Sequence, residues 1–201
     1  MFGRSLKLLS AGLLLVLLLP VGVAQAKEVL GFGLGEQTVE SVLSELRSQN
    51  ADFSTRDVER PRNERPKITI HSGYQLIEKM GRNPVVVLVF TPKNGVLYTV
   101  RVDWVDTDPG DLAQSLKLSL TENYGEGERG VITGQPAITY RLGKDHPGQF
   151  AALIFGKQVD APHNLTLLYL DELKRREAEA QVEADRAIRS MEWSDRHSGD
   201  L

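Results

Sequence analysis

The most constraining feature of this chain is a run of six apolar residues, Val85 to Phe90, bounded by Pro84 and Pro92. Five of the six are β-branched or aromatic, which is typical of a strand buried on both faces. After Asn94-Gly95, apolar and polar residues alternate from Val96 to Trp104, as in a strand with one core face and one wetter face. Because Asn-Gly accepts positive φ and Pro92 cannot extend the first strand, we expect a hairpin here.

Residues 1–26 have the pattern of an export signal. Two basic residues precede an apolar run over 8–23, and Ala24-Gln25-Ala26 supplies the small-x-small pattern of a signal peptidase site. The alternative is an uncleaved membrane anchor, since the run approaches the roughly 20 residues that span a bilayer. Pro20 near its end and the cleavage pattern favour removal after Ala26. We therefore expect a periplasmic protein with no stable membrane anchor once the signal is cleaved.

Composition excludes several kinds of function. The chain has no cysteine, so a lipid anchor on a cysteine, disulfides, thiolate zinc sites and thiol catalysis are all excluded. Without its two basic leader residues the chain carries 22 basic against 27 acidic residues, a net charge of −5. That balance argues against nucleic acid as a partner, because phosphate binding needs a concentrated basic face. The stretch Arg56 to Lys67 is rich in arginine but contains its own acids, so we interpret it as a solvated loop.

The first half of the mature chain predicts one helix and three strands. A glycine-rich stretch at 31–35 suggests a flexible entry loop, and apolar residues at helical spacing follow from Val39, with Thr38 as the N-cap. Alternation from Ile68 to Ile77 then predicts a strand that bulges at Ser72-Gly73 and precedes the hairpin.

The second half repeats this order. Asp108 caps a predicted helix that ends at Gly125, and strands follow at 138–142, 150–155 and 165–170, about 65 to 70 positions after their counterparts. The sequence thus predicts an α+β fold: an antiparallel sheet of about six strands with helices on one face, built from two tandem α-β-β-β units at 27–107 and 108–170. Whether the two units are a true internal duplication stays open at this point.

Residues 171–201 predict a charged C-terminal helix and tail. Alanine, glutamate, arginine and lysine dominate, and Asp171 with Arg175 and Glu172 with Arg176 stand four residues apart in the favourable order. The apolar stripe is thin and rich in alanine. It favours a protruding solvated helix over a coiled-coil partner helix.

Motifs for chemistry are sparse. The four histidines are scattered, and no Gly-x-Ser-x-Gly elbow is present, so we expect neither a metal nor a cofactor. Four aspartates between 103 and 111 lack the order of a calcium-binding loop, and helix capping accounts for two of them. A hydrolase would need Asp103, Asp106 and His71 to converge in one cleft, and it is the least supported class.

What remains is a surface. The middle strand of each unit is apolar on both sides, so the sheet face turned away from the helices should have an apolar centre ringed by polar residues. The alternative is that the 51–67 segment, the last helix or a second subunit covers it. The predicted partner-binding residues are Val85, Val87, Val89, His71, Arg101, Asp103 and Arg141.

The layout of residues 31–170 resembles that of the β-lactamase-inhibitor proteins and the small outer-membrane assembly lipoproteins, although the absent cysteine departs from the lipoproteins. The resemblance implies a protein-binding role. Together with the apolar sheet face and the sparse motifs for chemistry, it favours a non-enzymatic module that binds an envelope protein through that face. The alternative is a small-ligand or lipid-binding module with a pocket between sheet and helices. The sequence does not define an oligomeric state.

Overall fold

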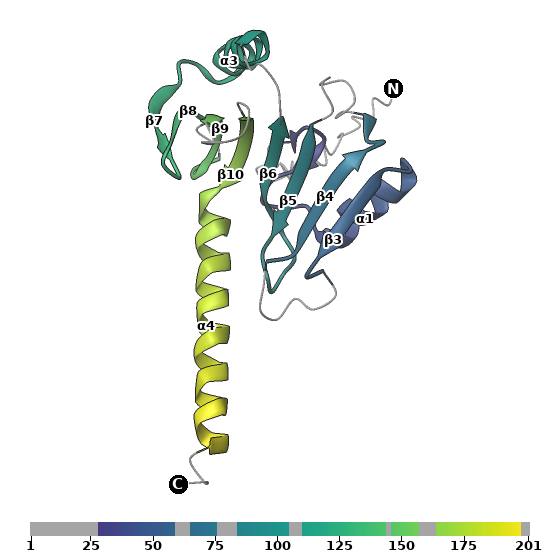
Figure 1. Cartoon of the computed structure of the whole chain (residues 1–201), viewed down its shortest axis with the longest axis vertical. Coiled ribbons are helices and arrows are strands. Elements are labelled where there is room, and N and C mark those ends of the chain that lie inside the picture. The colour runs from purple at the N-terminus through teal and green to yellow at the C-terminus, as the bar shows by residue number, and fades with distance from the viewer. Residues whose placement is uncertain are drawn as a thin grey trace, which may run out of the picture.

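The computed structural model describes residues 28–58, 65–75, 84–104, 110–143, 146–156 and 164–197 (Figure 1). The predicted leader at 1–26 and the expected cap at Asp108 lie outside these ranges. No helix within the described part of the chain combines the length and the apolar character needed to cross a membrane.

The elements fall into two successive groups. A short hairpin comes first, formed by β1 (Glu28–Val29) and β2 (Phe32–Gly33). The first group is α1 (Val39–Ser48), β3 (Asp52–Arg56), β4 (Lys67–Ser72), β5 (Val85–Phe90) and β6 (Leu97–Trp104). The second is α3 (Gly110–Tyr124), β7 (Glu128–Ile132), β8 (Gln135–Arg141), β9 (Gln149–Gly156) and β10 (Asn164–Asp171), followed by α4 (Glu172–His197).

One antiparallel sheet contains eight of these strands, in the order β3-β4-β5-β6-β10-β9-β8-β7. The expected hairpin at its centre is confirmed as β5 and β6, which pair antiparallel with Val86 opposite Val102. The two groups meet where β6 pairs with β10, the last strand of each. The predicted α+β class with an antiparallel sheet is therefore confirmed.

The expected number of strands was too low, because each helix precedes four strands in the sheet and not three. The missed strands are β3 and β7, which form the two edges of the sheet. Nearly all residues of both are exposed, and only Phe53 and Ile132 are partly buried. An edge strand with so little core contact has no apolar alternation to reveal it.

A β-bulge changes which β6 residues face the core. Thr99 pairs with Val89 but Leu97 pairs with Phe90, so Tyr98 is the extra residue. Leu97 is fully buried in the main core, whereas Tyr98 lies on the other side of the sheet with Leu170. The expected alternation, with Tyr98 on the helix side, is wrong at this point.

The main core lies between one face of the sheet, here called the first face, and the layer of α1 and α3. Buried residues of both helices belong to the same apolar cluster as Val86, Leu88 and Val100. As expected, Thr38 caps α1 through its hydroxyl, and α3 ends before Gly125, whose φ is +83°.

The glycine-rich start is not the flexible entry loop that the sequence suggested. Phe32 and Leu34 are fully buried, and the Phe32 ring stacks on Tyr74 with the ring centroids 5.1 Å apart. The N-terminal hairpin is therefore part of the core.

The second face of the sheet carries the first turns of α4. Ala178 is fully buried against Tyr98 and Leu170. The far end of the helix extends beyond the sheet (Figure 1), and its 26 residues span about 39 Å. Four of its large apolar side chains are exposed: Leu173, Ile188, Met191 and Trp193.

Asp171 is the last residue of β10 and stands directly before α4. Its Oδ1 accepts a hydrogen bond from the Lys174 backbone N–H at 2.9 Å, and its Oδ2 accepts one from Gln149 Nε2 at 3.0 Å. Asp171 therefore caps the helix. The expected partner of Arg175 is replaced by Glu172, at 2.7 Å, while the expected pair of Glu172 with Arg176 is present at 2.9 Å.

Replacing Asp171 with alanine should lower the free energy of unfolding by about 2 kcal/mol and Tm by about 4 to 8 °C, because a helix cap and a buried hydrogen bond are both lost. The matched control is Asp111→Ala in the exposed first turn of α3, for which we expect less than about 0.5 kcal/mol. Thermal and urea unfolding measure both variants. Equal losses in the two would contradict this role of Asp171.

Candidate functional site

All seven predicted partner-binding residues belong to the second face. The three β5 valines alternate with buried core residues, and Val85 and Val87 pair with Asp103 and Arg101. His71 follows the buried Ile70 on β4. Arg141 pairs with Phe150 on β9, so it lies four strands from β5, or about 19 Å away. The structure thus brings six of the seven together on β4, β5 and β6.

Side chains on the second face are partly exposed on β5, the open part of this face, and buried on β8 and β9. Val85, Val87 and Val89 are only partly buried. On β8 and β9, by contrast, the second-face residues Ala137, Ala152 and Ile154 are all buried. The accessible apolar strip is therefore narrower than the sequence suggested, and it is made by the valines of β5.

A polar network holds the arginine beside this strip. Arg101 Nε donates to Asp103 Oδ2 at 2.8 Å, and the Thr166 hydroxyl donates to Asp103 Oδ1 at 2.7 Å. The Arg101 side chain is 48% exposed, whereas that of Asp103 is 22% exposed. Asp103 therefore holds the Arg101 guanidinium in position, and the guanidinium remains accessible next to Val85 and Val87.

His71 and Asp103 do not form a catalytic pair. His71 Nε2 lies 3.1 Å from the Ser54 hydroxyl on β3. Asp103 stands on β6, two strands from His71 or about 10 Å away, and is engaged by Arg101 and Thr166. Asp106, the third residue of the hydrolase hypothesis, lies outside the described residues. No group of three or more metal-ligating side chains occurs in the described ranges.

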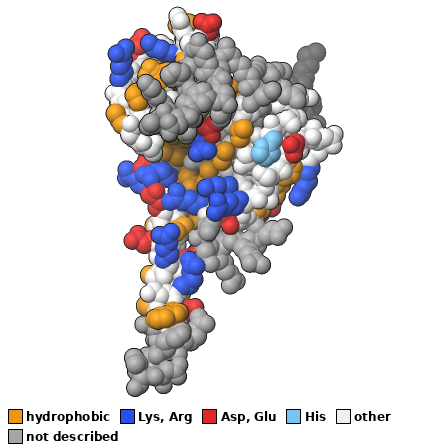
Figure 2. Space-filling model, in the orientation of Figure 1, with side chains coloured by type: hydrophobic (Ala, Val, Ile, Leu, Met, Phe, Trp, Pro, Cys, Tyr) orange, Lys and Arg blue, Asp and Glu red, His pale blue; other side chains and the backbone are white. Residues whose placement is uncertain are grey.

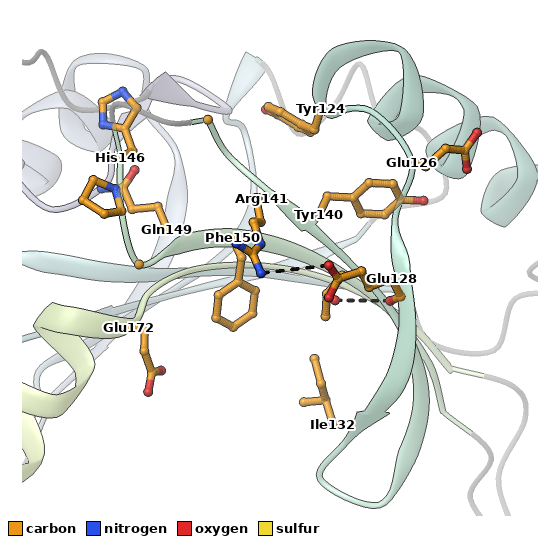
Figure 3. Close-up of a pocket in the computed structure, with 14 residues that line it drawn as sticks. Tyr124, Glu126, Glu128, Ile132, Tyr140, Arg141, His146, Gln149, Phe150 and Glu172 are labelled. Atoms are coloured by element: carbon orange, nitrogen blue, oxygen red, sulfur yellow. Dashed lines mark hydrogen bonds and ion pairs between the residues drawn. The ribbon is translucent and has the colours of Figure 1, made fainter.

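A groove with a volume of about 870 Å³ lies at the β7 end of the sheet. Figure 3 shows Tyr124 and Tyr140 on one side of the strands and Phe150 and Ile132 on the other, with Arg141 between them. Arg141 and Glu128 approach to 4.0 Å with side chains 87% and 77% exposed, so their ion pair is weak. Sequence reasoning missed this groove because much of it comes from the unrecognised strand β7 and the turn before β9.

Two buried polar atoms at the groove have no hydrogen-bond partner among the described residues: the Tyr140 hydroxyl and Gln149 Oε1. The Tyr140 ring is packed beneath Gly127, where an added Cβ would stand 2.7 Å from the ring. A small residue at 127 is therefore required. Unpartnered buried polar atoms of this kind are stabilised when a ligand or water supplies the missing partner.

Two ionisable groups at the groove, Glu172 and Tyr124, have shifted pKa values. Hydrogen bonds from Arg175 and Arg176 lower the pKa of Glu172 from 4.5 to about 2, so this residue remains a carboxylate at neutral pH. Burial raises the pKa of the Tyr124 phenol above its usual value, so that phenol remains neutral. Neither group is tuned for proton transfer near pH 7.

Comparisons with protein-family models, with curated proteins and with solved structures found no match. The resemblance in layout noted above therefore rests on the order of elements alone.

Because the pKa of Glu172 is lower in the folded protein, its ion pairs stabilise the fold above pH 4.5, and this stabilisation is lost as the pH falls toward 2. Urea unfolding at pH 5.5 and pH 2.5 should show a smaller loss of stability in Glu172→Gln than in the wild type. Glu126→Gln, an exposed groove residue without a described ion pair, is the control and should follow the wild type. An unchanged pH dependence in Glu172→Gln would refute the assignment.

Proposed function

We propose that this protein is an exported, non-enzymatic protein-binding module that contacts its partner through the open part of the second face, over β4 to β6. The observation that carries the proposal is the partly exposed strip of Val85, Val87 and Val89 beside the fixed guanidinium of Arg101. The helices α1 and α3 pack on the opposite face. The buried contact of α4 is with Tyr98 and Leu170, and Val89 at one end of the strip packs against it.

The chemistry of this surface suits a protein partner. Apolar side chains next to an accessible arginine are typical of interface centres, where the arginine provides directed hydrogen bonds and the apolar groups exclude water. The strip lies on inner strands whose backbone groups are already paired. A partner would therefore be recognised through side chains and not by the addition of a strand.

The export part of the proposal is supported by the leader pattern of residues 1–26. The non-enzymatic part is supported by the separation of His71 from Asp103 and by the low pKa of Glu172. An envelope protein is the partner class that this location implies.

Photo-crosslinking in cells tests the proposal. A benzophenone amino acid at Val87 should give a discrete crosslinked species, whereas the same group at the exposed Leu118 on α3 should not. Arg101→Glu should reduce the Val87 product several-fold, because it reverses the charge at the strip. Identical products from both positions, or none from Val87, would refute the proposal.

The groove at the β7 end supports a second candidate function, the binding of a small apolar ligand. Its volume of about 870 Å³ lies within the range of ligand sites, and it combines aromatic and apolar side chains with the unpartnered Tyr140 hydroxyl.

A fluorescent naphthalene dye tests this second candidate. Ile132 lines the groove, whereas its neighbour Val131 is 71% exposed and does not. We expect saturable dye binding that weakens roughly tenfold in Ile132→Glu and is unchanged in Val131→Glu, because only the first places a charge against the ligand. Equal effects of the two substitutions would exclude the groove as the dye site.

A further inference from the structure

A basic cleft lies where the end of β3 and the start of β4 face the middle of α4. It has a volume of about 430 Å³ and is lined by Arg56, Asp57, Arg65, Lys67, Val182, Arg186 and Arg189. Five of these seven residues are basic and one is acidic, although the whole chain has a net charge of −3. Figure 2 shows Lys and Arg side chains gathered around the root of α4.

Strand pairing and helix periodicity together build this cleft. Arg56 pairs with Lys67 across β3 and β4. On α4, the residues at 182, 186 and 189 share one face because they are four and seven positions apart. Arg65 Nη2 approaches Glu179 Oε1 to 3.4 Å, which ties the start of β4 to α4.

Within the described ranges, three of the five basic side chains of the cleft have no carboxylate partner: Lys67, Arg186 and Arg189. Asp57 pairs with Arg56 at 3.3 Å, and Glu179 pairs with Arg65. Among the described residues, Lys67 and Arg186 form no ion pair, and Arg189 donates to a backbone carbonyl, that of Asp185, at 3.3 Å.

The first turns of α4 are different. There Lys174, Arg175 and Arg176 each pair with a glutamate of the same helix. Like charges facing one another across a cleft destabilise a fold unless an anion lies between them.

We propose that the basic cleft binds a phosphate-bearing anion. Guanidinium groups present paired N–H donors that match phosphate oxygens, and four of the five basic residues are arginines. The volume suits one or two phosphate groups on a small ester or a lipid headgroup. The cleft borders the open strip, because Lys67 pairs with Val89 across β4 and β5, and it shares no lining residue with the groove.

Two probes distinguish the sources of phosphate. Calorimetry with inorganic pyrophosphate at low ionic strength tests soluble phosphates, and co-sedimentation with vesicles of phosphatidylglycerol or phosphatidylcholine tests lipid headgroups. Binding of pyrophosphate supports a soluble ligand. Binding only to phosphatidylglycerol vesicles supports a lipid headgroup.

The variant Arg186→Ala/Arg189→Ala should weaken whichever interaction is found by roughly 100-fold, because two charge-assisted contacts are removed. Lys117→Ala/Arg129→Ala removes the same charge from exposed positions elsewhere and should change affinity less than about twofold, through net charge alone. Arg186→Lys should keep part of the affinity, since the charge remains but the paired donors are lost. Circular dichroism checks that α4 stays helical.

Absence of binding to either probe at low ionic strength would overturn the proposal for the wild-type protein, whatever the variants do. Equal losses in the cleft and control variants would overturn it as well, because they would show attraction to net charge and not to a defined site. An affinity that falls as salt is raised is expected if the cleft is used.

Discussion

The antiparallel pairing of β6 with β10 is the contact on which the rest of this structure depends. It joins the last strand of each half at the centre of the sheet, with Val102 opposite Leu167 and Val100 opposite Tyr169. All four side chains are buried in the main core. Because the sheet is continuous across this pair, α1 and α3 cover a single face, and the opposite face extends across both halves.

The last helix covers part of the second face and lines the basic cleft. Its first turns bury Ala178 against Tyr98, and its middle brings Arg186 and Arg189 opposite the start of β4. Val89 packs against the buried contact of the helix, and all three valines of β5 stay partly exposed. One element therefore defines both the edge of the open strip and one wall of the basic cleft.

Sequence reasoning succeeded where a local pattern determines the structure. The β5-β6 hairpin, the Thr38 cap and the end of α3 at Gly125 follow from apolar periodicity and from turn and cap residues close in the sequence. The positions of β3 and β7 could not be predicted in this way, because strands with exposed side chains carry no periodic signal. The bulge at Tyr98 could not be predicted from the sequence either, since it depends on the register of β6 with β5.

The candidate sites were partly predictable for the same reason. Alternation along single strands placed Val87, Arg101 and His71 on the second face. The basic cleft was missed because Arg56 to Lys67 looks balanced by its own acids, while Arg186 and Arg189 come from about 120 residues later in the chain. Only the path of α4 across the sheet shows that these charges meet.

The central position of β10 has a consequence for folding. β10 (residues 164–171) pairs with both β6 and β9. Until β10 has left the ribosome or a membrane channel, β6 and β9 are therefore unpaired edge strands with long apolar stretches. Truncation before β10 would therefore leave two partial sheets, each with an unpaired apolar edge that favours aggregation.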